Sequence, residues 1–342
     1  MAIPFVLVSD AIFSQLFYVD LNEFMMHSIP FGPEKLAASA IVAITSALLY
    51  LCLLTAIDNK LIAAFSVFVF AFCTSAWSTA SRALWQHGPS MLCLTAALLL
   101  ILRARDKHRL IQFVSLPLAF SYVCRPTNSI PIVLLSLYVL IEYRAYFLKY
   151  CLWSLLVAVP FFFYNHTVFH SFLPSYYTYP LSIHAAFLEA LIANLISPSR
   201  GIFIFSPVLI FSVLGILYKY KIGKATNLDL CLVSWMVLHW IVVSMNAVWW
   251  AGFSVGARFL TDILPILIYY LAYAAKGISE LKGWAKKPVL AALSIAAVAS
   301  FLIHFHAATA WAVFDWNTTP NNIDAHIERI WDWRDPQFLR GL

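Results

Sequence analysis

Residues 36–57, LAASAIVAITSALLYLCLLTAI, decide the fold class, because this stretch of 22 residues holds no charged side chain. A helix needs about 20 apolar residues to cross a bilayer, since hydrocarbon offers the backbone no hydrogen-bond partner. Nine further apolar runs follow it along the chain. The sequence therefore predicts an all-α polytopic bundle of about ten transmembrane helices, at 36–57, 61–77, 89–102, 110–123, 128–142, 147–164, 202–218, 228–248, 261–275 and 288–307.

The composition agrees with a membrane protein. The 342 residues are 62% apolar and 11% charged, with a mean hydropathy of +0.82, whereas a soluble domain is nearer ~45–50% apolar and ~25% charged. A disordered chain and a nucleic-acid-binding module are excluded, because the 22 basic residues are thinly spread. The six cysteines show neither CxxC nor Cys/His spacing, so we expect no disulfide framework, no zinc site and no other metal cofactor.

The basic residues predict the orientation. Fourteen of the 22 Lys and Arg residues lie in alternate connections, which we assign to the cytoplasmic side, and eight lie on the other side. This alternation holds at every connection when ten spans are counted, and it places both ends of the chain outside. We expect an outer N-terminal segment over 1–35, the helical bundle over 36–307, and an outer C-terminal tail over 308–342.

Each outer loop within the predicted bundle carries one arginine and no lysine. The planar guanidinium suits bidentate capture of a phosphate, which lysine does less well. Together the four groups would bind a phosphate or diphosphate headgroup at the outer membrane surface. The alternative is that each arginine only marks the headgroup level at the end of a span. The candidate phosphate-binding residues are Arg82, Arg125, Arg200 and Arg258, with His87 as a further donor.

The acids of the outer side are candidates for a general base. Asp20 and Glu23 precede the first span and could take the proton of an acceptor hydroxyl, the alternative being a solvated loop. Asp262 follows Arg258 by four residues, so we expect these two to form an ordinary helical ion pair rather than to catalyse. His239 lies within a span, where we expect it to make an interhelical hydrogen bond.

Aromatic residues are the other feature of the outer loops. Twelve Trp and sixteen Tyr residues form, by default, the belts found at both membrane interfaces. The pair Trp249–Trp250 and the tyrosines of 175–179 stand in outer loops, where their flat rings are also suited to stacking on a sugar. The candidates for this role are Trp250 and Tyr177.

Several outer-loop motifs, taken in order, resemble a known family. The chain is similar to the GT-C superfamily of polytopic membrane glycosyltransferases, and most to its bacterial branch related to protein mannosyltransferases and lipid A aminoarabinose transferases. The similarity extends over nearly the whole chain, although each motif is short. It rests on residues 18–24 ahead of Pro30–Pro33, on Ser81–Pro89, on Ser197–Gly201 with Ser206–Pro207, on Trp250–Leu260 and on Trp331–Pro336.

The resemblance implies a reaction. A sugar would move from a polyprenyl-phosphate donor to a hydroxyl of a glycan, lipid or protein acceptor, with inversion at the anomeric carbon. The family's catalytic acid lies in the first outer loop after a first transmembrane helix. No apolar span precedes that loop here, so the resemblance leaves Asp20 and Glu23 for this role. It assigns the donor phosphate to Arg258 and Arg200, supported by Arg82, His87 and Arg125.

The resemblance also implies a location and leaves two alternatives. The expected location is the bacterial inner membrane, with the site on the periplasmic face and the membrane lipid as surroundings. One alternative is a flippase or transporter of lipid-linked sugars, although no internal repeat is found and almost every charge lies at the end of a span. The other alternative is a catalytically inactive homologue, since Ala257 stands where a proline is common in the family.

Overall fold

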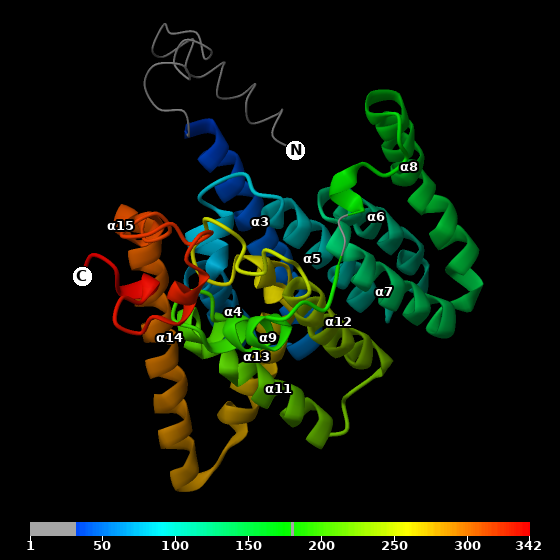
Figure 1. The fold of residues 1–342 in the computed structure, drawn as a ribbon. Coiled ribbons are helices and arrows are strands. Elements are labelled where there is room, and N and C mark those ends of the chain that lie inside the picture. Colours follow the sequence, from blue (N-terminus) through cyan, green and yellow to red (C-terminus); the bar gives the residue numbers. More distant parts are fainter. Residues whose placement is uncertain (1–31, 179–180) are drawn as a thin grey trace, which may run out of the picture.

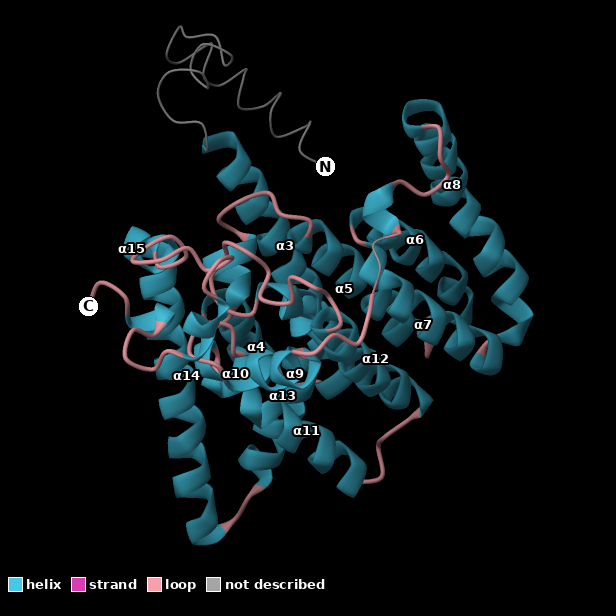
Figure 2. Cartoon of the chain, in the orientation of Figure 1, coloured by secondary structure: helices cyan, strands magenta, loops and turns pink. Residues whose placement is uncertain are grey.

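The computed structural model describes residues 32–178 and 181–342. Within these two ranges the chain is helical, with loops between the helices and no strand (Figure 2). The prediction of an all-α fold is therefore confirmed for the described part of the chain. Asp20 and Glu23, the two candidate bases, lie outside the described residues.

The α-helices follow one another along the chain, and several of the connections between them contain 3₁₀ turns (Figure 1). Their bounds are α3 Gly32–Ile57, α4 Lys60–Phe72, α5 His87–Ala104, α6 Ser115–Cys124, α7 Ser129–Glu142, α8 Arg144–Phe169, α9 Phe187–Ile196, α10 Ile202–Phe205, α11 Ile210–Lys221, α12 Asn227–Ser244, α13 Leu264–Glu280, α14 Lys286–Thr309 and α15 Trp311–Asp315.

In the described part of the chain, six helical segments are long and apolar enough to cross a membrane, which makes the chain an integral membrane protein by length and composition. They are Glu34–Ile57, His87–Ala104, Arg144–Phe169, Asn227–Ser244, Arg258–Glu280 and Gly283–Thr309. The other four predicted runs form shorter helices, so the number of ten spans is not confirmed and stays a prediction.

The run 202–218 shows why some predicted spans are short. Pro207 has no amide hydrogen and disfavours a helical conformation at the residue before it. Ser206 accordingly has φ −130° and ψ 69°, which ends α10 and separates it from α11. Similarly, the run 110–123 begins as a 3₁₀ helix over His108–Val114 and becomes α-helical only at Ser115. Uninterrupted apolar sequence therefore overestimates uninterrupted helix.

Helix α13 forms the centre of the bundle and packs against α3, α4 and α11. Its side chains are almost all buried from Leu264 to Ala274. The crossing with α11 is close because Gly215 has no side chain: a Cβ there would lie 1.8 Å from the carbonyl oxygen of Tyr270. Small residues at such crossings are what allows membrane helices to approach.

Helices α8 and α14 lie at opposite edges of the bundle (Figure 1). Their outward faces are apolar: Leu148 and Phe163 on α8 are each 72% exposed, and Ile295 on α14 is 69% exposed. A soluble protein rarely leaves such continuous apolar surface in water. These faces are therefore suited to contact lipid tails.

The C-terminal tail folds back over the loops at one end of the bundle (Figure 1). It contains α15 and two 3₁₀ turns, Ile327–Trp331 and Gln337–Leu339. Trp316 and Ile330 of the tail pack with Trp249 and with Ala190 of α9 in a small apolar cluster of their own. The tail thus fixes the loops near α9 and residue 249 in place.

Candidate functional site

A cavity of about 820 Å³ opens where several helix ends meet. Helix α5 begins at its wall, α6 and α12 end there, and the 3₁₀ helix Arg258–Ile263 closes one side. Its lining combines cationic, aromatic and polar side chains, and it comprises Leu84, Trp85, Gln86, His87, Tyr122, Arg125, Pro126, Thr127, Ser129, Tyr176, Tyr177, Leu181, Val242, Asn246, Val248, Arg258 and Phe259.

A buried carboxylate lies directly behind this lining. Asp262 is 0% exposed and its Oδ2 accepts a short hydrogen bond from Nη1 of Arg125. The same oxygen lies 3.2 Å from Nδ1 of His87. Three elements distant in sequence are joined at this point: the start of α5, the end of α6 and the 3₁₀ helix that leads into α13. The expected ion pair between Asp262 and Arg258 is not formed.

His87 has two contacts at Nδ1. Nη1 of Arg125, which can only donate, lies 2.7 Å from it, and Oδ2 of Asp262, a carboxylate oxygen, lies 3.2 Å from it. His87 also lines the cavity, and its Nε2 has no hydrogen-bond partner within the described structure. Nε2 is therefore the ring nitrogen that is available to a ligand.

Among the described residues, Arg258 is a cation of the cavity with no acidic partner. Its guanidinium carbon lies 4.5 Å from the ring centre of Trp85 and 5.6 Å from that of Phe259. Its Nε is buried and makes no hydrogen bond to any residue that the structure describes. A half-buried guanidinium held on aromatic faces, without a carboxylate among the described residues, is in the state in which it can capture an anion.

The pKa of Arg125 is lowered because its guanidinium is buried. Burial lowers the pKa of Arg125 from 12.5 to about 10, and the nearby Arg258 cation contributes to the lowering. The group still carries its charge at neutral pH. Arg125 and Arg258 thus face one cavity, and the carboxylate of Asp262 balances Arg125 but not Arg258.

A tyrosine pair forms the opposite wall. The 3₁₀ turn Ser175–Tyr177 places both rings on the cavity. The hydroxyl of Tyr177 donates to the Val123 carbonyl at 2.7 Å, and that of Tyr176 donates to Oε1 of Gln86 at 2.5 Å. The ring of Tyr177 also lies 5.4 Å from that of Tyr122. The structure therefore places Tyr177 in the cavity lining, with its ring against those of Tyr122, Phe161 and Tyr176.

Three of the predicted site residues lie away from this lining. Arg82 is exposed. Trp250 donates from Nε1 to Asp324 of the tail at 2.7 Å. Arg200 is 1% exposed, and every one of its side-chain hydrogen bonds goes to a neutral oxygen, so its guanidinium holds the tail rather than facing the cavity. Those partners are the carbonyls of Ser199, Trp250 and Gly252 and the amide oxygens of Asn317 and Gln337.

The described chain begins close to the cavity. Glu34, near the start of α3, accepts a hydrogen bond of 2.8 Å from the backbone amide of Leu84, which lines the cavity. The first described turn of α3 therefore lies beside the wall of the cavity.

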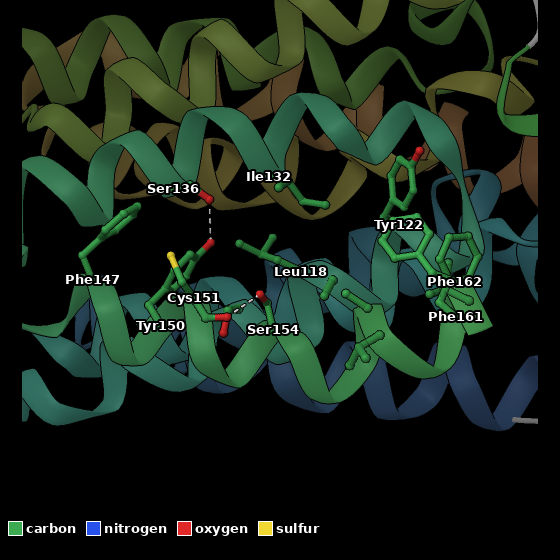
Figure 3. A pocket seen from close by; sticks show the side chains of 15 residues that line it. Leu118, Tyr122, Ile132, Ser136, Phe147, Tyr150, Cys151, Ser154, Phe161 and Phe162 are labelled. Atoms are coloured by element: carbon green, nitrogen blue, oxygen red, sulfur yellow. Dashed lines mark hydrogen bonds between the residues drawn. The ribbon is translucent and has the colours of Figure 1, made fainter. Parts of the chain in front are cut away.

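A second, apolar groove of about 260 Å³ lies between α6, α7 and α8 (Figure 3). Its few polar groups are satisfied, as in the 2.8 Å hydrogen bond between Ser136 and Tyr150. Leu118, Ile132 and the two rings Phe161 and Phe162 supply apolar walls. The lining also includes Tyr122 of α6, which lines the cationic cavity as well. The two spaces therefore share a wall residue.

Sequence reasoning does not single out Trp85 of the site, although it stands two positions before the predicted His87 in the same motif. Tyr176 belongs to the aromatic loop 175–179, from which only Tyr177 is a predicted site residue. Asp262 was assigned to the wrong partner, because its pairing with Arg125 depends on the tertiary fold. His239 donates to the Phe259 carbonyl at 2.9 Å, as expected of a buried hydrogen-bonding histidine.

Comparison of the chain with protein-family models, with curated proteins and with solved structures finds no match.

Proposed function

We propose that the chain is an integral-membrane glycosyltransferase that moves a sugar from a polyprenyl-phosphate donor to an acceptor hydroxyl. The observation that carries the proposal is Arg258, which faces the cavity with no acidic partner in the described part of the chain. Arg125 and His87 line the same cavity. These three side chains form the proposed phosphate site, and the motifs of the outer loops supply the reaction class.

The chemistry follows from a phosphodiester donor. A carboxylate takes the proton of the acceptor hydroxyl, and the hydroxyl oxygen attacks the anomeric carbon with inversion. The bond between that carbon and the phosphate oxygen breaks, and its electron pair stays on the phosphate. The phosphate charge thereby grows from −1 towards −2. Arg258, Arg125 and His87 stabilise the developing charge, and one preorganised donor of this kind contributes on the order of 3–4 kcal/mol.

The base in this proposal is Asp20 or Glu23. The resemblance supports this choice, since the family's catalytic acid lies in the loop that corresponds to this segment. Within the described structure, Asp262 lies beside the phosphate site but is already bonded to Arg125. The proposal therefore assigns the base to Asp20 or Glu23 and not to Asp262.

The hydrocarbon chain of the donor needs an apolar surface beside the phosphate site. The groove between α6, α7 and α8 offers one, and Tyr122 lines both spaces (Figure 3). The apolar outward face of α8 adjoins the same groove. A lipid phosphate in the cavity could extend its tail along this groove into the membrane. In the proposal the cavity opens to the outer, periplasmic side of a bacterial inner membrane.

The test incubates the purified protein, in nanodiscs, with a panel of polyprenyl-phosphate sugars and an acceptor mixture, and measures release of free polyprenyl phosphate. We expect release with at least one donor. Arg258→Ala should lower the rate by about 10²–10³. Arg82→Ala is the matched control, because Arg82 is an exposed arginine outside the cavity, and it should keep the wild-type rate.

Two other results would redirect the assignment. Wild-type activity in Arg258→Ala, at equal protein quality, would contradict the proposed phosphate site. Donor binding without release, in a chain that moves the lipid between leaflets of a liposome, would identify the flippase predicted as the alternative. Binding with neither release nor movement would identify an inactive homologue.

A further inference from the structure

The buried carboxylate behind the cavity has a feature that a structural ion pair would not need. Oδ2 of Asp262 binds Arg125, but Oδ1 of Asp262 is buried and has no hydrogen-bond partner in the described structure. The pair between Lys219 and Asp229, in another part of the bundle, is complete by contrast. Oδ1 of Asp229 accepts from Lys219 at 2.5 Å, and its Oδ2 accepts from Thr226 at 2.8 Å.

Leaving one carboxylate oxygen unpaired costs stability, because buried polar atoms are nearly always hydrogen-bonded. Asp262 thus stabilises the packing of these helices less than a fully hydrogen-bonded carboxylate would. Its effect on the charge of the cavity is large, however. The charged side chains of the lining are Arg125 and Arg258 among the described residues, and Asp262 neutralises the first and leaves the second. The cavity therefore presents an excess of one positive charge.

We propose that Asp262 is a positioning residue that sets the charge of the cavity to match a phosphodiester in preference to a phosphate monoester. The inference rests on the proposed function, because it concerns the same phosphate site. A phosphodiester carries one negative charge, whereas a monoester carries about −1.5 to −2 near neutral pH. One uncompensated guanidinium balances the diester and leaves the monoester with excess negative charge.

The consequence concerns the product. A transfer from a phosphodiester donor leaves a phosphate monoester in the site, with one more negative charge than the substrate. A cavity with two free guanidiniums would hold that product more tightly than the donor. With Arg125 neutralised by Asp262, the product is bound less well than it would be by two free cations, and it leaves more easily.

The geometry also keeps Asp262 away from the ligand. Asp262 is fully buried and does not line the cavity, whereas both of its partners, Arg125 and His87, do. It can therefore act only through those two side chains. Removing its charge would free the guanidinium of Arg125 for a ligand without placing any new group in the cavity.

The experiment measures binding of two short-chain lipids that carry no sugar, by titration calorimetry on the purified protein in detergent. Dioctanoyl phosphatidic acid supplies a monoester, and dioctanoyl phosphatidylglycerol supplies a diester. We expect Asp262→Asn to shift the ratio of the two affinities by about tenfold towards the monoester, since an extra unit charge near the ligand is worth that much or more. Asp262→Glu should retain the wild-type ratio.

Two further variants make the result independent of whether Asp262→Asn folds well. Arg125→Gln removes the cation and leaves the carboxylate, so the ratio should shift in the opposite direction, towards the diester. The double variant Arg125→Gln with Asp262→Asn restores an excess of one positive charge, and its ratio should return to that of the wild type. Asp229→Asn is the matched control for removal of a buried carboxylate elsewhere, and it should leave the ratio unchanged.

A purely structural role would lower the amount of folded protein without moving the ratio. The proposal is overturned if monodisperse Asp262→Asn, or Arg125→Gln, binds the two lipids in the wild-type ratio, or if the double variant fails to restore that ratio. Because neither lipid can donate a sugar, these outcomes are distinct from failure of the proposed function. A wild-type protein that binds both lipids but transfers no sugar would overturn only the enzymatic proposal.

Discussion

The Asp262 carboxylate binds Arg125, which lies 137 positions earlier in the chain, and not Arg258, which precedes it by four. The reason is the local helix type. Residues Arg258–Ile263 form a 3₁₀ helix, in which three residues complete a turn and side chains four apart point in directions about 120° apart. Arg258 therefore turns towards Trp85 and the cavity, while Asp262 turns towards the interior.

Replacing Trp85 should weaken the phosphate site without altering its charge. The Trp85 ring supports Arg258 at 4.5 Å, and a cation–π contact is worth about 0.5–2 kcal/mol depending on its exposure. We expect Trp85→Ala to weaken binding of dioctanoyl phosphatidylglycerol by roughly three- to tenfold. Trp284→Ala is the control, because Trp284 is an 87% exposed tryptophan outside the cavity lining. Equal affinities for the two variants would show that Trp85 does not position Arg258.

The sequence was sufficient for the fold class and for part of the site. Apolar runs require helices in a membrane, whatever their packing, so the all-α class followed from composition and periodicity alone. Three of the predicted phosphate-binding residues, His87, Arg125 and Arg258, meet at one cavity. They stand at helix ends. The two arginines are predictable because each outer loop of the predicted bundle carries a single arginine, and His87 because it lies in the same predicted loop as another of these single arginines, Arg82.

The remainder depends on tertiary contacts that no local pattern encodes. Arg200 has the same kind of neighbours in sequence as Arg125, yet the folded tail supplies amide oxygens from Asn317 and Gln337 that enclose its guanidinium. A single arginine in a loop therefore does not show whether its guanidinium is enclosed by other parts of the protein, as in Arg200, or faces a cavity, as in Arg125. Likewise, the hydropathy of the run 202–218 predicts one continuous span, although Pro207 within it is a residue that interrupts helices. The structure has the interruption at that position.

Removal of the Arg200 side chain should release the C-terminal tail. Burial lowers the pKa of Arg200 from 12.5 to about 9, and the group is held by neutral oxygens alone. Arg200→Met would leave several buried acceptors unpaired, at a cost of at least about 3 kcal/mol. We expect a lower melting temperature and rapid proteolysis within 308–342. Arg334→Ala, at an exposed arginine of the tail, should change neither. A wild-type cleavage pattern in Arg200→Met would contradict this role.

A methyl group at Gly215 should separate α11 from α13. The added Cβ would lie 1.8 Å from the Tyr270 carbonyl oxygen, which is backbone and cannot move without the helix. We expect Gly215→Ala to destabilise the bundle by at least about 3 kcal/mol, beyond the usual cost of overpacking. The measurement is the monodisperse fraction after heating in detergent. Gly88→Ala is the matched control, because its Cβ would meet Ile41 at an ordinary 3.6 Å. Equal stability of the two variants would contradict the close crossing.

High pH should loosen the tyrosine wall of the cavity. Burial raises the pKa of Tyr177 from 10.0 to about 12, and its hydroxyl donates to the Val123 carbonyl at 2.7 Å. The Tyr177 hydroxyl therefore loses its proton at a lower pH when the segment is unfolded or undocked than when it is docked. The stabilisation from the neutral phenol is complete below pH 10 and is lost as the pH rises through 12. The measurement is the tyrosinate absorbance of the wild type and of Tyr177→Phe as the pH is raised. We expect the difference between the two titration curves to show one step, near pH 12. Since phenylalanine keeps the ring contact with Tyr122 but cannot ionise, the variant should keep this wall docked over the same pH range. A midpoint at the ordinary value would mean that the hydroxyl is solvated and does not hold the turn Ser175–Tyr177 against α6.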